Sequence, residues 1–162
     1  MAEDTLRFIV DSNVGKLAKW LRMLGYDAVF FDGEDDAYMI DRALKEERVI
    51  LTRDTQVMKR GVITSGRLKA ILIDSDQPEP QVRQVIDTLH IDSQSRLFTV
   101  CLECNNPLEE RSKEEVEQRV PPYVFQTQQQ YMECPVCHRI YWRGTHWQAM
   151  VQKLERLTKQ HR

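Results

Sequence analysis

The chain has 162 residues, a formal net charge of −2 and four cysteines, with 41% hydrophobic and 30% charged residues. This profile is typical of a soluble globular protein and excludes the collagen-like, low-complexity and disordered classes. No stretch approaches the roughly 18 apolar residues of a membrane span, and the acidic start lacks the basic region of a signal peptide. We therefore expect a cytoplasmic protein with no membrane partner, in which stable disulfides are rare.

The first hundred residues predict strands that alternate with helices. The strands are expected at residues 6–11, 27–31, 48–54 and 68–74. A helix is expected from about Val14 to a cap at Gly25, and another after Asp35 or Asp36, with Ile40, Ala43 and Leu44 on one side. A short helix with a loop is expected over 55–67, and a further helix over 80–89. This alternation predicts an α/β domain with a mostly parallel sheet.

The alternation stops near residue 97, where cysteine pairs and a Pro-Pro step begin. We therefore expect two units, 1–96 and 97–162. The second unit should end in a helix, because Thr145 and Gln148 have the spacing of a capping box. The apolar stripe of this helix is expected to pack back on the rest of the protein. It consists of Trp147, Met150, Val151, Leu154 and Leu157.

Basic residues are unevenly distributed along the chain, although its net charge is only −2. Residues 133–162 carry six basic and two acidic side chains, a net charge of +4. Residues 53–69 carry five basic side chains against the single Asp54. Such stretches are either solvated faces or contacts for an anionic partner, so the net charge does not exclude nucleic acid.

Two cysteine pairs, Cys101 with Cys104 and Cys134 with Cys137, each enclose two residues. This spacing lets one tight turn present both sulfurs to one metal ion, and two such turns supply the four tetrahedral ligands that zinc prefers. The pattern predicts a closed, structural zinc site that supplies much of the folding energy of a small module. His138 and His146 are expected to lie outside the ligand set. Buried free thiols are the alternative.

Three aspartates, Asp11, Asp54 and Asp74, each end a predicted parallel strand. Ligands of open α/β sheets bind beyond the carboxyl ends of the strands, so these acids are expected to meet at one edge. Asp36, at a helix start, is a fourth candidate. Converging carboxylates suit Mg²⁺ or Mn²⁺, which polarise a phosphate and generate hydroxide for phosphodiester hydrolysis.

Each acid also has a structural interpretation, because an aspartate at a strand end commonly forms a turn or caps a helix. The local sequence does not separate Asp74 from Asp76. Thr52 and Asn13 are short polar groups beside the acids that are suited to orienting water or phosphate.

Four segments then occur in a fixed order: VDSNVGKLAKWLRMLGYD, ERVILTRD, the paired cysteine motifs and YWRGTHW. Together they resemble the PIN-like ribonuclease family with a C-terminal zinc ribbon, named for the C-terminal domain of the Mut-seven exonuclease. The resemblance covers residues 6 to 152. It implies a PIN-like α/β domain with an acidic divalent-metal site, an appended zinc ribbon with a terminal helix, and action on RNA.

The resemblance also implies roles for particular residues. Asp11, Asp36 and Asp54 match the acidic positions, with Asp36 preferred to Asp35, and Asp74 as a fourth acid. Asn13 stands where the family usually has another residue type, so it either joins the site or weakens it. Phosphate contacts are expected from basic side chains near the metal site. These are Lys16, Lys19, Arg22 and Arg53.

The leading hypothesis is a divalent-metal-dependent ribonuclease with structural zinc, acting on tRNA or single-stranded RNA by metal-activated water. The second hypothesis is a non-catalytic RNA- or ribosome-binding adaptor, which needs the basic faces and the ribbon without the acids. Phosphatase or phosphotransfer chemistry is a third option, for which the chain lacks a glycine-rich phosphate loop.

Overall fold

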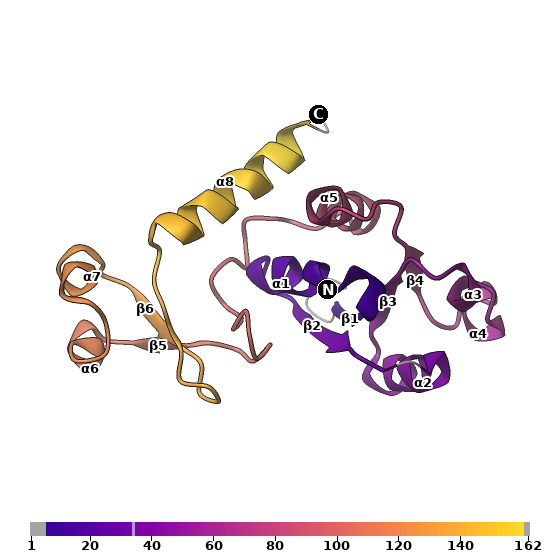
Figure 1. Ribbon diagram of the computed structural model, residues 1–162, viewed down its shortest axis with the longest axis horizontal. Helices are drawn as coiled ribbons and strands as arrows, with labels where there is room; N and C mark the ends of the chain where they lie inside the picture. Colours follow the sequence, from indigo (N-terminus) through magenta and orange to yellow (C-terminus); the bar gives the residue numbers. More distant parts are fainter. Residues whose placement is uncertain (1–5, 34, 161–162) are drawn as a thin grey trace.

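The computed structural model describes residues 6–33 and 35–160, with side chains described to 157. Its larger sheet has four parallel strands in the order β2-β1-β3-β4 (Figure 1). The strands are β1 (Arg7–Asp11), β2 (Asp27–Phe31), β3 (Val49–Thr52) and β4 (Ala70–Leu72). The chain passes from β1 to β2 on one side and returns to place β3 on the other. The order therefore reverses at β1, where α/β sheets bind ligands.

Successive residues of the central strands face opposite layers, so both sheet faces are covered. Phe8, Val10 and Leu51 belong to one apolar cluster, whereas Ile9 and Ile50 belong to another. A strand buried on both faces carries a nearly continuous apolar run. The prediction of an α/β protein with a parallel sheet is confirmed.

Helices on the first face pack with Phe8 and Val10. They are α1 (Lys16–Met23), α5 (Pro78–Leu89) and the C-terminal α8 (Thr145–Gln160) (Figure 1). Three helices pack on the opposite face, in the cluster of Ile9 and Ile50. They are α2 (Asp36–Glu46), α3 (Thr55–Met58) and α4 (Gly61–Thr64). The prediction for α2 is wrong at Leu44, which is 38% exposed, because the buried face is formed by Met39, Ile40 and Ala43 and Leu44 lies at its edge.

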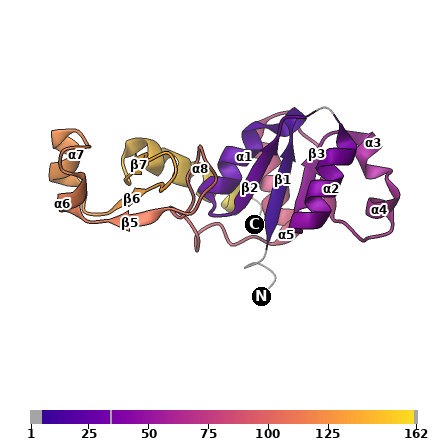
Figure 2. The ribbon, with the colours of Figure 1, turned by 90° about the horizontal axis from the view of Figure 1, so that it is seen from below.

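A second, antiparallel sheet lies beside the first (Figure 2). Its strands are β5 (Glu109–Arg111), β6 (Tyr131–Glu133) and β7 (Ile140–Tyr141). Two short helices, α6 (Lys113–Val116) and α7 (Pro122–Thr127), fill the long segment between the cysteine pairs. Val116, Val124 and Tyr131 give this part a small core of its own.

The terminal helix α8 returns to the first sheet, as its apolar stripe predicts. Trp147 and Leu154 belong to the same cluster as Phe8. The predicted capping box is wrong: Thr145 is already the first helical residue, and the Gln148 side chain donates to the carbonyl oxygen of Arg143. The division at residues 96 and 97 stays a prediction, and α8 ties the two parts together. No described helix is long and apolar enough to cross a membrane.

Candidate functional site

The acidic edge, as we call the group of Asp11, Asp36 and Asp54, lies beyond the carboxyl ends of the parallel strands. Asp11 is the last residue of β1, and Asp54 follows two residues after the end of neighbouring β3. Asp36 begins α2, the helix after β2. The sheet order therefore brings together side chains that are far apart in the sequence.

A chain of hydrogen bonds joins Asp11 to Asp54 through Thr52. The fully buried Thr52 hydroxyl donates to Oδ2 of Asp11 at 2.7 Å and accepts from the backbone N–H of Asp54 at 2.9 Å. Asn13 lies across the same gap: its amide donates to Oδ2 of Asp11 at 3.4 Å, and its Oδ1 accepts from the Arg53 N–H at 3.1 Å. Thr52 and Asn13 thus orient the loop after β3 against the end of β1.

Part of the structural interpretation of the acids also holds. Oδ1 of Asp11 accepts from the Ser12 N–H at 2.8 Å, and Oδ1 of Asp54 accepts from the Gln56 N–H at 2.8 Å. Both carboxylates therefore cap the helix that follows while they belong to the acidic edge. These caps hold each side chain in one orientation at the site.

The Asp36 carboxyl is influenced by both other acids. Burial raises its pKa first, and the charges of Asp54 and then Asp11 raise it further. Asp35, the competing candidate, instead caps α2 by accepting from the Ala37 N–H at 2.9 Å, and it is exposed. Asp36 is thus the acid that faces the group.

Asp74 is not part of this hydrogen-bonded group in the described structure. It is exposed, and its backbone N–H donates to the Gln84 side chain at 2.9 Å. Asp76 accepts a hydrogen bond from the side chain of the neighbouring Gln77 at 3.3 Å. A role for Asp74 as fourth acid stays a prediction.

The basic candidates fall into two groups. Lys16, Lys19 and Arg53 are exposed, the first two on α1 and the third between Thr52 and Asp54. Arg22 is held by backbone oxygens instead: Nε donates to Ala28 at 3.0 Å, and a terminal nitrogen donates to Leu102 at 2.8 Å. These contacts give Arg22 a structural role that the sequence reasoning missed.

The four cysteines form a compact group whose sulfur atoms all lie within 4.8 Å of one another. Within the described residues, no other group of three or more Cys, His, Asp or Glu side chains lies close enough together to share a metal ion. The donor set fits zinc, which prefers four thiolates in a tetrahedron. His138 and His146 are outside the group, as predicted.

Both cysteine turns have the same backbone geometry. The N–H of Cys104 points to the sulfur of Cys101 at 3.3 Å, and that of Cys137 points to the sulfur of Cys134 at 3.5 Å. The next residues, Asn105 and His138, have positive φ angles of 62° and 64°. Each donates its N–H to the carbonyl of the first cysteine, at 3.0 Å and 2.9 Å respectively. The turns are therefore preformed for a shared ion.

The electrostatics of the cysteine group favour a cation. The hydrogen bond with Cys137, together with burial and the neighbouring Cys101, raises the pKa of the Cys104 thiol to about 12. A divalent cation relieves this crowding by stabilising the thiolates. Tyr141 supports the group: its hydroxyl lies 3.2 Å from the Cys101 sulfur and accepts from the Leu102 N–H at 3.2 Å.

A buried carboxylate beside the cysteines was missed by the sequence reasoning. Glu133 is 5% exposed and accepts hydrogen bonds from Arg119 at 3.0 and 3.1 Å and from Arg111 at 3.0 Å. The bonds from Arg119, then those from His138 and Arg111, outweigh burial and lower the pKa of Glu133 to about 2. This network ties β5, β6 and the second cysteine turn together.

The first cysteine turn is docked on the open edge of the parallel sheet. Ala28 of β2 donates its N–H to the Asn105 side chain at 2.8 Å and accepts from Arg22 through its carbonyl. The Asn105 amide also donates to Asp27 at 2.6 Å, and Asp27 pairs with the buried Arg48 at 2.8 Å. The backbone groups of Ala28 are thus paired with side chains. These contacts fix the ribbon, the part of the chain that carries the cysteine turns and the strands β5 to β7, relative to the acidic edge.

Comparison with known proteins agrees with this architecture. A family model described as the Mut7-C RNAse domain matches residues 6–154, which includes the parallel sheet, the cysteine turns and most of α8. Searches of curated proteins and of solved structures found no match.

Proposed function

The chain belongs to the Mut7-C RNAse domain family, and from this premise we propose that it hydrolyses RNA phosphodiester bonds at the acidic edge with the help of a divalent cation. The observation that carries the proposal is the hydrogen-bonded unit of Asp11, Thr52 and Asp54, which Asp36 faces. The family match supports a ribonuclease-type activity, and the metal dependence and mechanism are our inference from the geometry.

The donor set of the acidic edge suits a hard cation. Asp11, Asp36 and Asp54 offer carboxylate oxygens, and their mutual repulsion, seen in the raised pKa of Asp36, falls when a cation lies between them. Mg²⁺ or Mn²⁺ would supply positive charge toward the phosphate and lower the pKa of a water molecule. The carboxylates are less closely grouped than the four sulfurs, so the residues would hold the ion with the help of water or substrate oxygens.

The chain's own residues then have distinct tasks. Thr52 holds Asp11 in position through its hydroxyl, and Asn13 holds the loop that carries Arg53. We propose that the exposed Lys16 and Lys19 of α1 bind phosphates of the substrate near the scissile bond. We assign Arg22 to the fold, because its guanidinium binds backbone oxygens.

We propose that zinc is held by Cys101, Cys104, Cys134 and Cys137. With all four positions filled by thiolates, the ion is structural and takes no part in the chemistry. Its consequence for function is indirect, because the first cysteine turn contacts Arg22 and β2. A PIN-like architecture remains a prediction from the family resemblance. A cytosolic location and tRNA or single-stranded RNA as substrate also remain predictions.

The test is RNA cleavage by the zinc-loaded protein with and without added Mn²⁺ or Mg²⁺. We expect divalent-dependent cleavage that falls on the order of 10²-fold or more in Asp11→Asn and in Asp54→Asn, since each removes a charge at the reacting centre. Asp74→Asn is the matched control and should lose much less, because Asp74 is exposed and lies outside the hydrogen-bonded unit of Asp11, Thr52 and Asp54.

Unchanged cleavage in both Asp11→Asn and Asp54→Asn would show that the activity comes from a contaminant and would overturn the assignment. Salt-sensitive RNA binding without any divalent-dependent cleavage would instead favour the adaptor hypothesis.

A further inference from the structure

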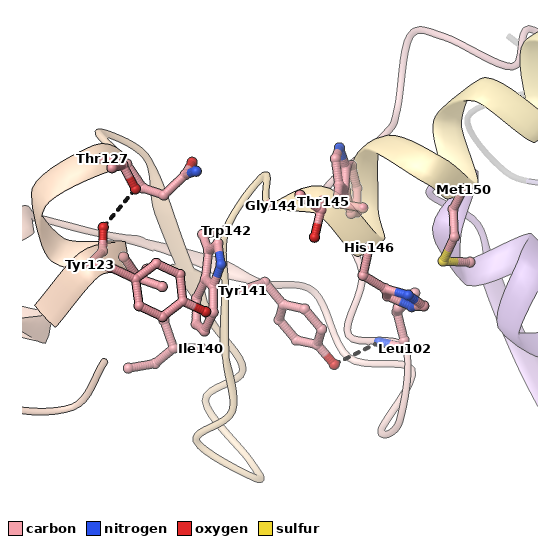
Figure 3. Close-up of a pocket in the computed structure, with 13 residues that line it drawn as sticks. Leu102, Tyr123, Thr127, Ile140, Tyr141, Trp142, Gly144, Thr145, His146 and Met150 are labelled. Atoms are coloured by element: carbon pink, nitrogen blue, oxygen red, sulfur yellow. Dashed lines mark hydrogen bonds between the residues drawn. The ribbon is translucent and has the colours of Figure 1, made fainter. Parts of the chain in front are cut away.

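A pocket of about 460 Å³ lies between α7, β7 and the first turn of α8, and its lining residue Tyr141 contacts the cysteine group. Figure 3 shows Tyr123 and Trp142 at one end, His146 and Met150 at the other, and Tyr141 between them. Among the lining residues that the structure describes, none is Lys, Arg, Asp or Glu. The volume is within the range of about 300–1,000 Å³ that small-molecule sites occupy.

The ring walls of this pocket are held in place by the surrounding structure. The Tyr141 hydroxyl is fixed by the Leu102 N–H and the Cys101 sulfur, each at 3.2 Å. The Trp142 indole lies so close to Gly144 that a Cβ atom there would come within 2.9 Å of Nε1. At the mouth, by contrast, Tyr123 is 68% exposed. The held rings of Tyr141 and Trp142, with the exposed ring of Tyr123 beside them, are suited to contact a flat ligand.

We propose that this pocket, the base pocket, binds an unpaired nucleobase of single-stranded RNA. Stacking on aromatic side chains is the main means by which proteins hold unpaired bases, and it needs no charged lining. Gln128, Thr145 and His146 supply hydrogen-bonding groups for the edge of a base. The inference rests on the proposed function, since it takes RNA as the ligand.

The charge around the base pocket is complementary to a phosphate backbone. Residues 133–146 carry two arginines and one acid, and that acid, Glu133, is buried and paired with Arg119 and Arg111. Arg139 and Arg143 flank the strand β7 and the lining residue Trp142. Bases can thus enter an uncharged pocket while cations outside it contact the phosphates.

A second groove shares the lining residue Leu102 with the base pocket, and Glu103 is its one acidic lining residue among those that the structure describes. This groove follows α1, whose first residues come shortly after Asp11, and it carries the cations Lys16 and Lys19 and the exposed ring of Phe30. A strand whose scissile phosphate is at the acidic edge can therefore follow α1 to the base pocket. The ribbon would then anchor the substrate at a distance from the cleavage site.

The test measures binding, so that it is independent of cleavage. The zinc-loaded full chain in an Asp54→Asn background is titrated with a fluorescently labelled single-stranded oligouridylate and with an abasic strand of the same length. We expect Tyr123→Ala to weaken oligouridylate binding by about 5- to 150-fold, the effect of one lost stacking contact of about 1–3 kcal/mol. Tyr123→Phe keeps the ring and should bind within about twofold of the parent.

The abasic strand makes the test specific for the base. It should bind more weakly than oligouridylate, and Tyr123→Ala should not weaken it further, because only phosphate contacts remain. Equal binding of both strands by the parent, or no effect of Tyr123→Ala, would overturn the proposal. So would self-association that depends on Tyr123, since the face would then bind protein. If the protein binds bases in this way but does not cleave RNA, the proposal for the base pocket is supported and the proposed hydrolysis is wrong.

Discussion

The cysteine group and the acidic edge are both candidate metal sites, yet they are built in opposite ways. The four sulfurs come from two turns of four residues each. Local hydrogen bonds of the same pattern set the two sulfurs within each turn, and the tertiary fold then brings Cys101 and Cys137 to 3.8 Å. The three carboxylates come from the ends of separate strands and from one helix start, and only the sheet order brings them near one another.

The contrast shows in how tightly each group is gathered. The sulfurs all lie within 4.8 Å of one another, whereas in the described residues the carboxylates form no equally compact set. A site that binds a permanent ion can be closed by its own backbone turns. A site that must admit a substrate has to stay open, and its acids repel one another until a cation and a phosphate arrive.

The largest effect should come from opening the closed site. Cys134→Ser removes one of four thiolates, and structural zinc contributes on the order of 10–16 kcal/mol to small zinc modules. We expect bound zinc to fall from about one per chain to nearly none, with loss of hydrogen-exchange protection in β5, β6 and β7. Metal analysis and hydrogen exchange measure both changes.

Val136→Ser is the matched control for this variant. Val136 lies in the same turn, between Cys134 and Cys137, and is 61% exposed. It should retain zinc and the protection of the ribbon. A Cys134→Ser protein with full zinc and an intact ribbon would contradict the idea of a site closed by all four thiolates.

An intermediate effect should come from the contact between the two regions. Arg22→Gln breaks charged hydrogen bonds to Ala28 and Leu102, so we expect the free energy of unfolding to fall by about 1.5–3 kcal/mol. Urea denaturation of the zinc-loaded chain measures this loss. Zinc content should be unchanged, because the cysteine turns keep their own hydrogen bonds.

Lys19→Gln removes a cation from the same helix, but from an exposed position. Its stability should stay within about 0.5 kcal/mol of the parent, while the salt dependence of RNA binding should become shallower by about one unit. If Arg22→Gln left stability unchanged and altered RNA binding as Lys19→Gln does, Arg22 would be a phosphate contact after all.

The smallest effect should come from relieving repulsion at the open site. The pKa of Asp36 is raised by burial and by Asp54 and Asp11, so its ionisation costs the folded state stability. This cost is absent below the pKa of the unfolded chain and develops as pH rises above it. Asp36→Asn should therefore stabilise the protein at pH 7 without Mg²⁺ or Mn²⁺, by less than about 1 kcal/mol because solvent screens the charges.

Thermal unfolding with and without Mn²⁺ checks this last prediction. Added Mn²⁺ should raise the melting temperature of the parent more than that of Asp36→Asn. Asp35→Asn is the control, since asparagine also caps helices and Asp35 is exposed. An equal response to Mn²⁺ in all three proteins would mean that Asp36 does not help to hold the ion.

Much of the α/β fold could be predicted because its signals are periodic. The continuous apolar run of β1 and the apolar stripes of α1, α5 and α8 appear directly in the residue order. The errors have local causes. Leu44 lies at the edge of the helix face that Met39, Ile40 and Ala43 bury, and Thr145 starts α8 one residue earlier than a capping box requires.

The sequence by itself determined the two cysteine pairs, because two residues between paired cysteines confine both sulfurs to one turn, whereas the meeting of the two turns depends on the tertiary structure. It also placed Asp11 and Asp54 at the ends of strands. Only the tertiary structure showed that Asp35 caps a helix while the charges of Asp54 and Asp11 raise the pKa of Asp36, and that Arg22 and Asn105 join the first cysteine turn to β2. Those contacts depend on strand order and side-chain direction across distant segments, which local spacing does not encode.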